Sequence, residues 1–176
     1  MLPSISFDDV ESGAWYYDAV TYVAQRKLMQ GIGDNRFDPD GTTTRAMLWT
    51  VLAKLDGVDT AAGSVWYEAS QKWAMENGIS DGSAPNGSIT REQFVTMLYA
   101  YAKYKGIDVS VGDETNILSY EDAFSISEWA IPAVQWACGS GLMKGDGANL
   151  MPGASATRAQ SATLLASFCR NVQNMK

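Results

Sequence analysis

Residues 15–31 read WYYDAVTYVAQRKLMQG, and this frame, a tryptophan followed sixteen positions later by a glycine, occurs three times in the chain. The second copy is WYEASQKWAMENGISDG at 66–82, and the third is WAIPAVQWACGSGLMKG at 129–145. Each copy has an aromatic residue at its eighth position and a leucine or isoleucine at its fourteenth. Such internal similarity is typical of a repeat architecture, so the sequence predicts three copies of one unit.

A Thr-Arg pair follows each copy after a polar, glycine-containing loop, and a second pattern begins at the arginine. The residues at +3, +6, +7 and +10 from the arginine form the stripe of an amphipathic helix. One unit cannot bury its stripe alone, so we expect the three second helices to form a bundle with one core, and the three leucines at +7 to meet near its axis. The stripes are Leu48, Val51, Leu52 and Leu55; Phe94, Met97, Leu98 and Tyr101; and Ser161, Leu164, Leu165 and Phe168.

The length and composition are those of one globular domain. The chain has 176 residues, of which 46% are hydrophobic and 19% charged. We expect a single all-α domain over 1–176, with helix-loop-helix repeats at about 7–56, 57–104 and 118–170. A polar connection at 105–117 separates the last two repeats. Its alternating Ile107, Val109 and Val111 would suit a brief extended segment.

The charge and residue types exclude several classes of function. A net charge of −7 and a pI near 4.5 argue against nucleic acid as a partner, because phosphate binding needs a basic face. No apolar run is long enough for a membrane span, and Met1 is followed by no signal-peptide pattern. The absence of histidine removes Ser-His-Asp triads and imidazole zinc sites, so we expect no cofactor, no metal and no catalytic residue. We expect Cys138 and Cys169 to be buried free thiols, too far apart to bond.

The Thr-Arg pairs predict a helix start that could bind an anion. Threonine is a good N-cap, and Gln93 and Gln160 complete a capping box, which Met47 cannot do. The helix N-terminus offers N–H groups and a positive dipole, and the arginine adds a cation, so a carboxylate or phosphate would be stabilised there. Exposed tryptophans would suit a sugar ring. The alternative is structural: arginines paired with acids of a neighbouring repeat, and tryptophans in the core. The candidate binding residues are Arg45, Arg91, Arg158, Thr44, Thr90, Thr157, Trp15, Trp66, Trp129, Gly31, Gly82 and Gly145.

These motifs resemble the S-layer homology family, in which an aromatic-x-Asp motif, a Trp, a Gly, a Phe-x-Pro loop and Thr-Arg-Ala-Glu follow one another. The first repeat has Phe7-Asp8-Asp9 and Phe37-Asp38-Pro39, and the third has Tyr120-Glu121-Asp122 and Leu150-Met151-Pro152. The middle repeat has Ile89-Thr90-Arg91-Glu92 but lacks the aromatic-x-Asp opening, unless Asp59 provides the acid, and lacks the Phe-x-Pro loop. The resemblance covers about residues 7–170 as three tandem repeats.

The resemblance implies a pseudo-threefold prism around a central three-helix bundle. It also implies non-covalent attachment to a secondary cell-wall polysaccharide that carries a pyruvate ketal on an amino sugar, and an extracellular location at the cell wall or S-layer. Asp9 and Asp122 then join the candidate carbohydrate-binding residues. A ketal pyruvate is a compact carboxylate, which fits the site derived from the residues.

The sequence therefore predicts a monomeric surface-anchoring module that does not insert in membranes. A protein-interaction module for assembling a surface layer is an alternative, and a wall-glycan hydrolase is a third, less favoured because no opposed acid pair is evident. We further expect the three grooves to differ. Asp81 precedes Gly82, whereas Gln30 and Lys144 stand at the equivalent positions, so a corner of Gly82 and Arg91 would bind an anion most weakly.

Overall fold

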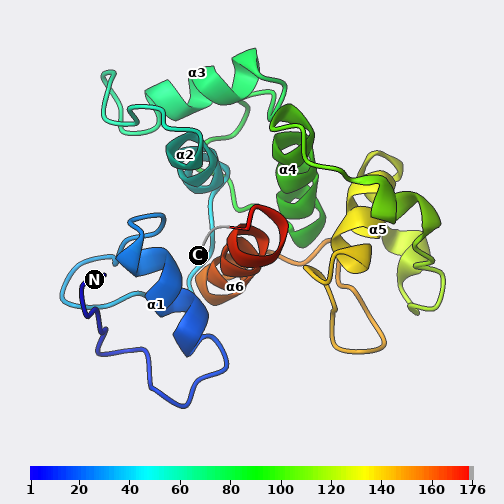
Figure 1. Ribbon diagram of the computed structural model, residues 1–176, viewed down its shortest axis with the longest axis horizontal. Helices are drawn as coiled ribbons and strands as arrows, with labels where there is room; N and C mark the ends of the chain where they lie inside the picture. Colours follow the sequence, from blue (N-terminus) through cyan, green and yellow to red (C-terminus); the bar gives the residue numbers. More distant parts are fainter. Residues whose placement is uncertain (175–176) are drawn as a thin grey trace.

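The computed structural model describes residues 1–174, and this part of the chain is helical without a β-strand (Figure 1). It contains three helix pairs, which we call the first, second and third pair. The pairs are α1 (Tyr17–Gln25) with α2 (Arg45–Leu55), α3 (Glu68–Glu76) with α4 (Arg91–Tyr104), and α5 (Ile131–Gly139) with α6 (Arg158–Ser167). Short 3₁₀ segments η1 (Ser110–Glu114), η2 (Ala123–Ser125) and η3 (Glu128–Ala130) precede α5, and a π-helical turn, η4 (Phe168–Val172), continues α6.

The second helices of the pairs lie inside and the first helices lie outside. In Figure 1, α6 is central with α2 and α4 beside it, and α1, α3 and α5 are peripheral. Each outer helix packs on the inner helix of another pair: α3 on α2, α5 on α4, and α1 on α6. The three pairs therefore form a closed ring, because the first pair also packs on the third, through α1 and α6.

The predicted stripes form the core. Leu52, Leu98 and Leu165 at the +7 positions are at most 1% exposed. The other stripe residues are buried as well, except Leu55, which is half-buried. The aromatic residues at the eighth position of each copy, Tyr22, Trp73 and Trp136, are also buried and attach the outer helices to the core.

Short backbone bridges join the three pairs at the start of the inner helices. Thr44 pairs with Ser88, Thr90 with Ser155, and Thr157 with Thr42, each as an isolated antiparallel bridge. Every bridge links two different pairs, and together they return to the starting pair. The Thr-Arg corners are therefore joints between pairs as well as helix starts.

The connection at 105–117 differs from the prediction. Val109 has φ −110° and ψ 8°, and the next residues form the 3₁₀ turn η1, so the expected extended segment is wrong. The turn packs on α5, where Gly112 lies so close that a Cβ would stand 2.8 Å from the backbone nitrogen of Trp136. Contact with α5, rather than local alternation, determines this conformation.

The two cysteines are free, as predicted, although Cys138 is half-buried and only Cys169 is fully buried. Burial raises the pKa of each thiol to about 11. Within residues 1–174, the helices are too short or too polar to cross a lipid bilayer.

Candidate ligand-binding grooves

The threonine N-caps are confirmed. The side chains of Thr44, Thr90 and Thr157 each accept a hydrogen bond from the backbone N–H three residues later, at 3.1–3.3 Å. Gln93 and Gln160 complete the capping box through their side-chain oxygens. The exclusion of Met47 was wrong, because its sulfur accepts from the backbone N–H of Thr44 at 3.4 Å. Sulfur is a weak acceptor, but it has the reach that the position needs.

The next N–H groups of each inner helix are bound by the loop of the neighbouring pair. Arg45 N–H donates to Gly87, and Ala46 N–H donates to Pro85, both at 3.0 Å. The same two bonds recur from α4 to Ala154 and Pro152, and from α6 to Gly41 and Pro39. Because these donors are already satisfied, the expectation that helix N–H groups form the anion sites is wrong.

The loop that caps each helix is the same in all three pairs, which corrects the prediction for the middle repeat. Pro39, Pro85 and Pro152 each stand six residues before the arginine. The residues before them, Asp38, Ala84 and Met151, all have positive φ, between 48° and 59°. Ser83-Ala84-Pro85 is thus the equivalent loop of the second pair, with serine where the other two loops have Phe37 and Leu150. The constant proline-to-arginine spacing is the signal that could have found it.

Each arginine reaches from one pair into the loop of the next pair. The Nε groups of Arg45, Arg91 and Arg158 donate to carbonyls two residues before the loop prolines. Arg158 makes a further bond to the carbonyl of Gln30 at 2.6 Å and lies 4.6 Å above the ring of Phe37. The arginines therefore hold neighbouring pairs together. This agrees with the structural role that the sequence analysis gave as the alternative to ligand binding.

Asp9 and Asp122 position two of these loops. Asp9 accepts from the backbone N–H groups of Phe37 and Asp38, both at 2.8 Å. Asp122 does the same for Leu150 and Met151. Asp59 has no such role, because it accepts from the N–H of Ala61, two residues away, so its suggested equivalence is wrong.

The three tryptophans that open the copies are exposed, which excludes the core alternative for them. Trp15 is 67% exposed, Trp66 55% and Trp129 56%. Trp15 and Trp66 each stack edge-on against the following tyrosine. Exposed indoles beside polar groups are typical of sugar-binding surfaces.

Trp15 lines a groove of about 440 Å³ that draws on all three pairs; we call it the Trp15 groove. The third pair supplies Lys144, Gly145 and one face of α6, and the second pair supplies Arg91. Gly145 has φ +62°, and a Cβ there would overlap the carbonyl oxygen of Asn149, so glycine is required. An aromatic face, a lysine and an arginine therefore converge on one groove.

Trp66 lines the equivalent groove of about 210 Å³, the Trp66 groove. Here the first pair supplies Gln30, Met47 and a face of α2, and the third pair supplies Arg158. Gly31 lies beside this groove and closely approaches the ring of Phe7, where a Cβ would stand 2.8 Å from a ring carbon.

The arginine and glycine that share a groove come from different repeats. Arg91 meets Gly145 and Lys144, whereas Asp81, next to Gly82, bonds Arg45 at 3.1 Å. The expected corner of Gly82 and Arg91 is therefore wrong, because packing joins each loop to the arginine of the preceding pair. The Asp81 carboxylate neutralises the positive charge of Arg45, whereas Lys144 adds a second positive charge beside Arg91.

Of the two buried arginines that line these grooves, Arg91 makes one side-chain hydrogen bond and Arg158 makes two. Arg91 is 9% exposed, donates from Nε to Leu150 at 3.0 Å, and has no carboxylate within salt-bridge distance among residues 1–174. Burial lowers the pKa of Arg91, and the Asp122 carboxylate opposes this shift. The guanidinium stays charged, so a ligand carboxylate would bind it with little competition.

Comparison with known proteins gives the same family as the motifs. Residues 6–46 and 119–162 match the model of the S-layer homology domain. Exoglucanase XynX of Acetivibrio thermocellus is 27% identical over 98% of this chain and 17% of its own length. An endoglucanase of Bacillus sp. (strain KSM-635) is 29% identical over 92% of this chain and 18% of its own. The S-layer protein sap of Bacillus anthracis is 25% identical over 92% of this chain and 21% of its own.

The chain thus spans about a fifth or less of these relatives, which include surface-layer proteins and glycan-degrading enzymes. In each of the three, the similar region extends over more than nine-tenths of this chain. Residues 6–46 and 119–162 of the chain are thus S-layer homology sequence, and the chain is a bacterial, extracellular module for anchoring at the cell wall.

Proposed function

We propose that this module binds an acidic secondary cell-wall polysaccharide, with a pyruvate-ketal amino sugar as the recognised unit. The partly satisfied, buried Arg91 in the Trp15 groove is the observation that supports this most directly. A ketal carboxylate at Arg91 and Lys144 would leave the apolar face of the sugar ring to Trp15. The Trp66 groove, with Arg158, offers the same arrangement at half the volume.

We also propose that the second pair is a third repeat, so that the chain is one non-catalytic, monomeric domain with pseudo-threefold symmetry. The second pair has the Thr90 N-cap, a loop in which the positive-φ residue Ala84 precedes Pro85, and the exposed Trp66. These features support the proposal, because all three recur in the two pairs that match the family model. In this arrangement Arg91, Arg158, Trp15 and Trp66 contact ligand in the two grooves, whereas Arg45 is paired with Asp81 and Trp129 lines neither groove. The remaining candidates shape the grooves: Thr44, Thr90, Thr157, Gly31, Gly82, Gly145, Asp9 and Asp122.

The test is a thermodynamic double-mutant cycle in which Arg91 is substituted on the protein and the ketal is removed from the polymer. The affinity of the module and of its Arg91→Gln variant is measured by calorimetry for intact wall polymer and for polymer from which the ketal has been removed. A charge-assisted contact of about 1.5–3 kcal/mol predicts that either change weakens binding ten-fold or more. If the two groups touch, both changes together cost little more than one.

Arg36→Gln is the matched control, because Arg36 is an exposed arginine in an ion pair with Asp9, outside both grooves. It should leave the affinity unchanged. Additive losses for Arg91→Gln and ketal removal, or equal binding of polymer with and without ketal, would contradict the proposal. Thermal unfolding of Arg91→Gln separates a loss of stability from a loss of affinity.

A further inference from the structure

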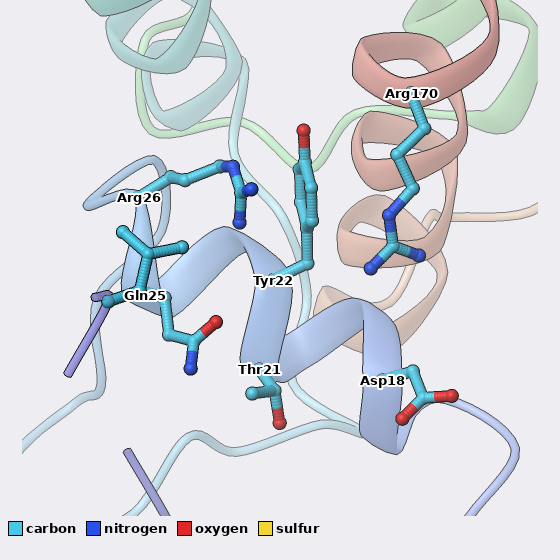
Figure 2. A pocket seen from close by; sticks show the side chains of 7 residues that line it. Asp18, Thr21, Tyr22, Gln25, Arg26 and Arg170 are labelled. Atoms are coloured by element: carbon cyan, nitrogen blue, oxygen red, sulfur yellow. The ribbon is translucent and has the colours of Figure 1, made fainter. Parts of the chain in front are cut away.

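A third cationic cavity lies between α1 and the end of α6, and it shares no lining residue with either groove. Its volume is about 410 Å³, and Figure 2 shows six of its seven lining residues with labels. One face of α1 supplies Asp18, Thr21, Tyr22 and Gln25, Arg26 follows directly at the end of α1, and Arg170 comes from the turn η4. Leu2 completes the lining.

Two arginines from opposite ends of the chain converge on one ring in this cavity. The guanidinium carbon of Arg26 lies 3.7 Å from the ring centroid of Tyr22, and that of Arg170 lies 4.3 Å from it. Figure 2 shows the ring between the two side chains. Burial raises the pKa of Tyr22, so the phenol is neutral at pH 7 and cancels neither positive charge.

The two guanidiniums have no other polar partner in the described part of the chain. Neither takes part in an ion pair or a side-chain hydrogen bond among residues 1–174. Asp18 lines the same cavity but lies beyond salt-bridge distance of both. A guanidinium that meets a ring through its flat face keeps its N–H donors for other acceptors.

We propose that this cavity, the Arg26–Arg170 site, binds an oxyanion, a phosphate or carboxylate group, carried on a hydroxyl-bearing ligand such as an acidic sugar. Two cations held on one ring, in a protein with a net charge of −7, concentrate positive charge where an anion is otherwise repelled. The guanidiniums bind the anionic group. Asp18, Thr21 and the Gln25 oxygen accept from or donate to the hydroxyls of the carrier.

The site is independent of the proposed grooves. At the positions equivalent to Arg26, the second and third pairs have Asn77 and Ser140. Among the helix pairs of residues 1–174, the Arg26–Arg170 site therefore belongs to the place where α1 meets the end of α6. Neither arginine lines the Trp15 groove or the Trp66 groove. A negative result for polysaccharide binding in the grooves would therefore not contradict the Arg26–Arg170 site. A negative result at the Arg26–Arg170 site would equally not contradict binding in the grooves.

The test is an NMR titration of the whole module with inorganic phosphate and, separately, with sodium acetate, at constant ionic strength set with sodium chloride. The Nε–Hε signals of Arg26 and Arg170 report this site, and the indole signals of Trp15 and Trp66 report the grooves. We expect saturable shifts at both arginines. Arg26→Gln and Arg170→Gln should each raise the dissociation constant for the bound anion five-fold or more. Lys144→Gln, in the Trp15 groove, should leave it unchanged.

The comparison of the two probes identifies the oxyanion: tighter binding of phosphate points to a phosphate-bearing ligand, and tighter binding of acetate to a carboxylate. Shifts of the arginine signals that are no larger than those caused by chloride would overturn the proposal. Unchanged affinity in both glutamine variants would do so too. The titration of the unsubstituted protein decides the question even if a variant fails to fold.

Discussion

The Arg45 guanidinium lies 3.1 Å from the Asp81 carboxylate, which belongs to the next helix pair. Arg45 is 14% exposed at its side chain and Asp81 73%, so the acid covers the cation from the solvent side. The Ser83 hydroxyl and N–H also bond Asp81, and these bonds together with Arg45 lower its pKa. The carboxylate is therefore ionised at neutral pH and occupies the place where a ligand carboxylate would meet Arg45.

Removing that carboxylate should create additional anion binding. Asp81→Asn keeps the shape of the side chain but not its charge, so Arg45 loses its competing anion. The total affinity for wall polymer should rise, and the rise should be largest at low salt, where screening is weak. Calorimetry at two salt concentrations measures it. Stability should change by less than about 1 kcal/mol, because the Asp81 carboxylate is largely exposed to solvent. An affinity that is equal in both proteins would show that Arg45 takes no part in binding.

Asp56 should make stability depend on acid pH. It accepts from Trp73 Nε1 at 3.0 Å, and from Tyr104 Oη and Lys105 Nζ at 2.8 Å each. Burial alone would raise the pKa of Asp56, but the bonds from Lys105, Tyr104 and Trp73 outweigh it and lower the pKa below 3.8. The stabilisation is thus complete above pH 3.8 and is lost as the pH falls through the lower, folded-state value.

The measurement is thermal unfolding from pH 7 to pH 2.5. Asp56→Asn should cost roughly 1–3 kcal/mol at pH 7, since it weakens three bonds to a charged acceptor. The gap between the two proteins should stay constant down to about pH 4 and close below it. A gap that closes between pH 7 and 5 would assign the effect to another group.

The shared core predicts a large difference between two leucines. Leu98 is fully buried at the +7 position of α4, whereas Leu118 is 68% exposed. Leu98→Ala should cost about 2–5 kcal/mol, because it removes buried methyl groups and leaves a cavity. Leu118→Ala should change stability by less than about 0.5 kcal/mol. Denaturant unfolding compares the two, and a cost at Leu98 as small as that at Leu118 would contradict the common core.

Two glycines of one loop should respond differently to alanine. A Cβ at Gly145 meets the Asn149 carbonyl oxygen at positive φ, whereas Gly153 has open space around it. Gly145→Ala should destabilise the protein by about 1–3 kcal/mol and displace the loop that lines the Trp15 groove. Gly153→Ala should stay within about 0.5 kcal/mol. Thermal unfolding and the indole NMR signal of Trp15 report both effects, and equal behaviour would disprove the requirement for glycine.

The sequence was sufficient for the helices and for their buried faces. The +3, +6, +7, +10 stripes depend only on helical geometry, which is local, and the buried Leu52, Leu98 and Leu165 confirm them. The threonine N-caps followed for the same reason. Met47 was missed because a sulfur acceptor is rare enough to be left out of the capping pattern.

The partners of the arginines could not be predicted from the sequence. Arg91 stands nine residues after Gly82, yet it shares its groove with Gly145, because each loop packs on the inner helix of another pair. That choice depends on the tertiary packing of whole helices, and a repeat pattern contains no information on which copy meets which. The loop at Ser83 was different: its proline spacing was present in the sequence, but a polar serine where the other loops have Phe37 and Leu150 obscured it.

The contact of α1 with α6 closes the chain of pairs, and this has a mechanical consequence for a protein that holds other material at a surface. A force on one helix pair is transmitted to both of its neighbours, because the bridge between Thr157 and Thr42 links the third pair back to the first. Each groove draws on all three pairs, so no pair can yield without opening both grooves. A ligand seated in one groove thereby resists the unravelling of every pair at once, and attachment to the wall strengthens the module under load.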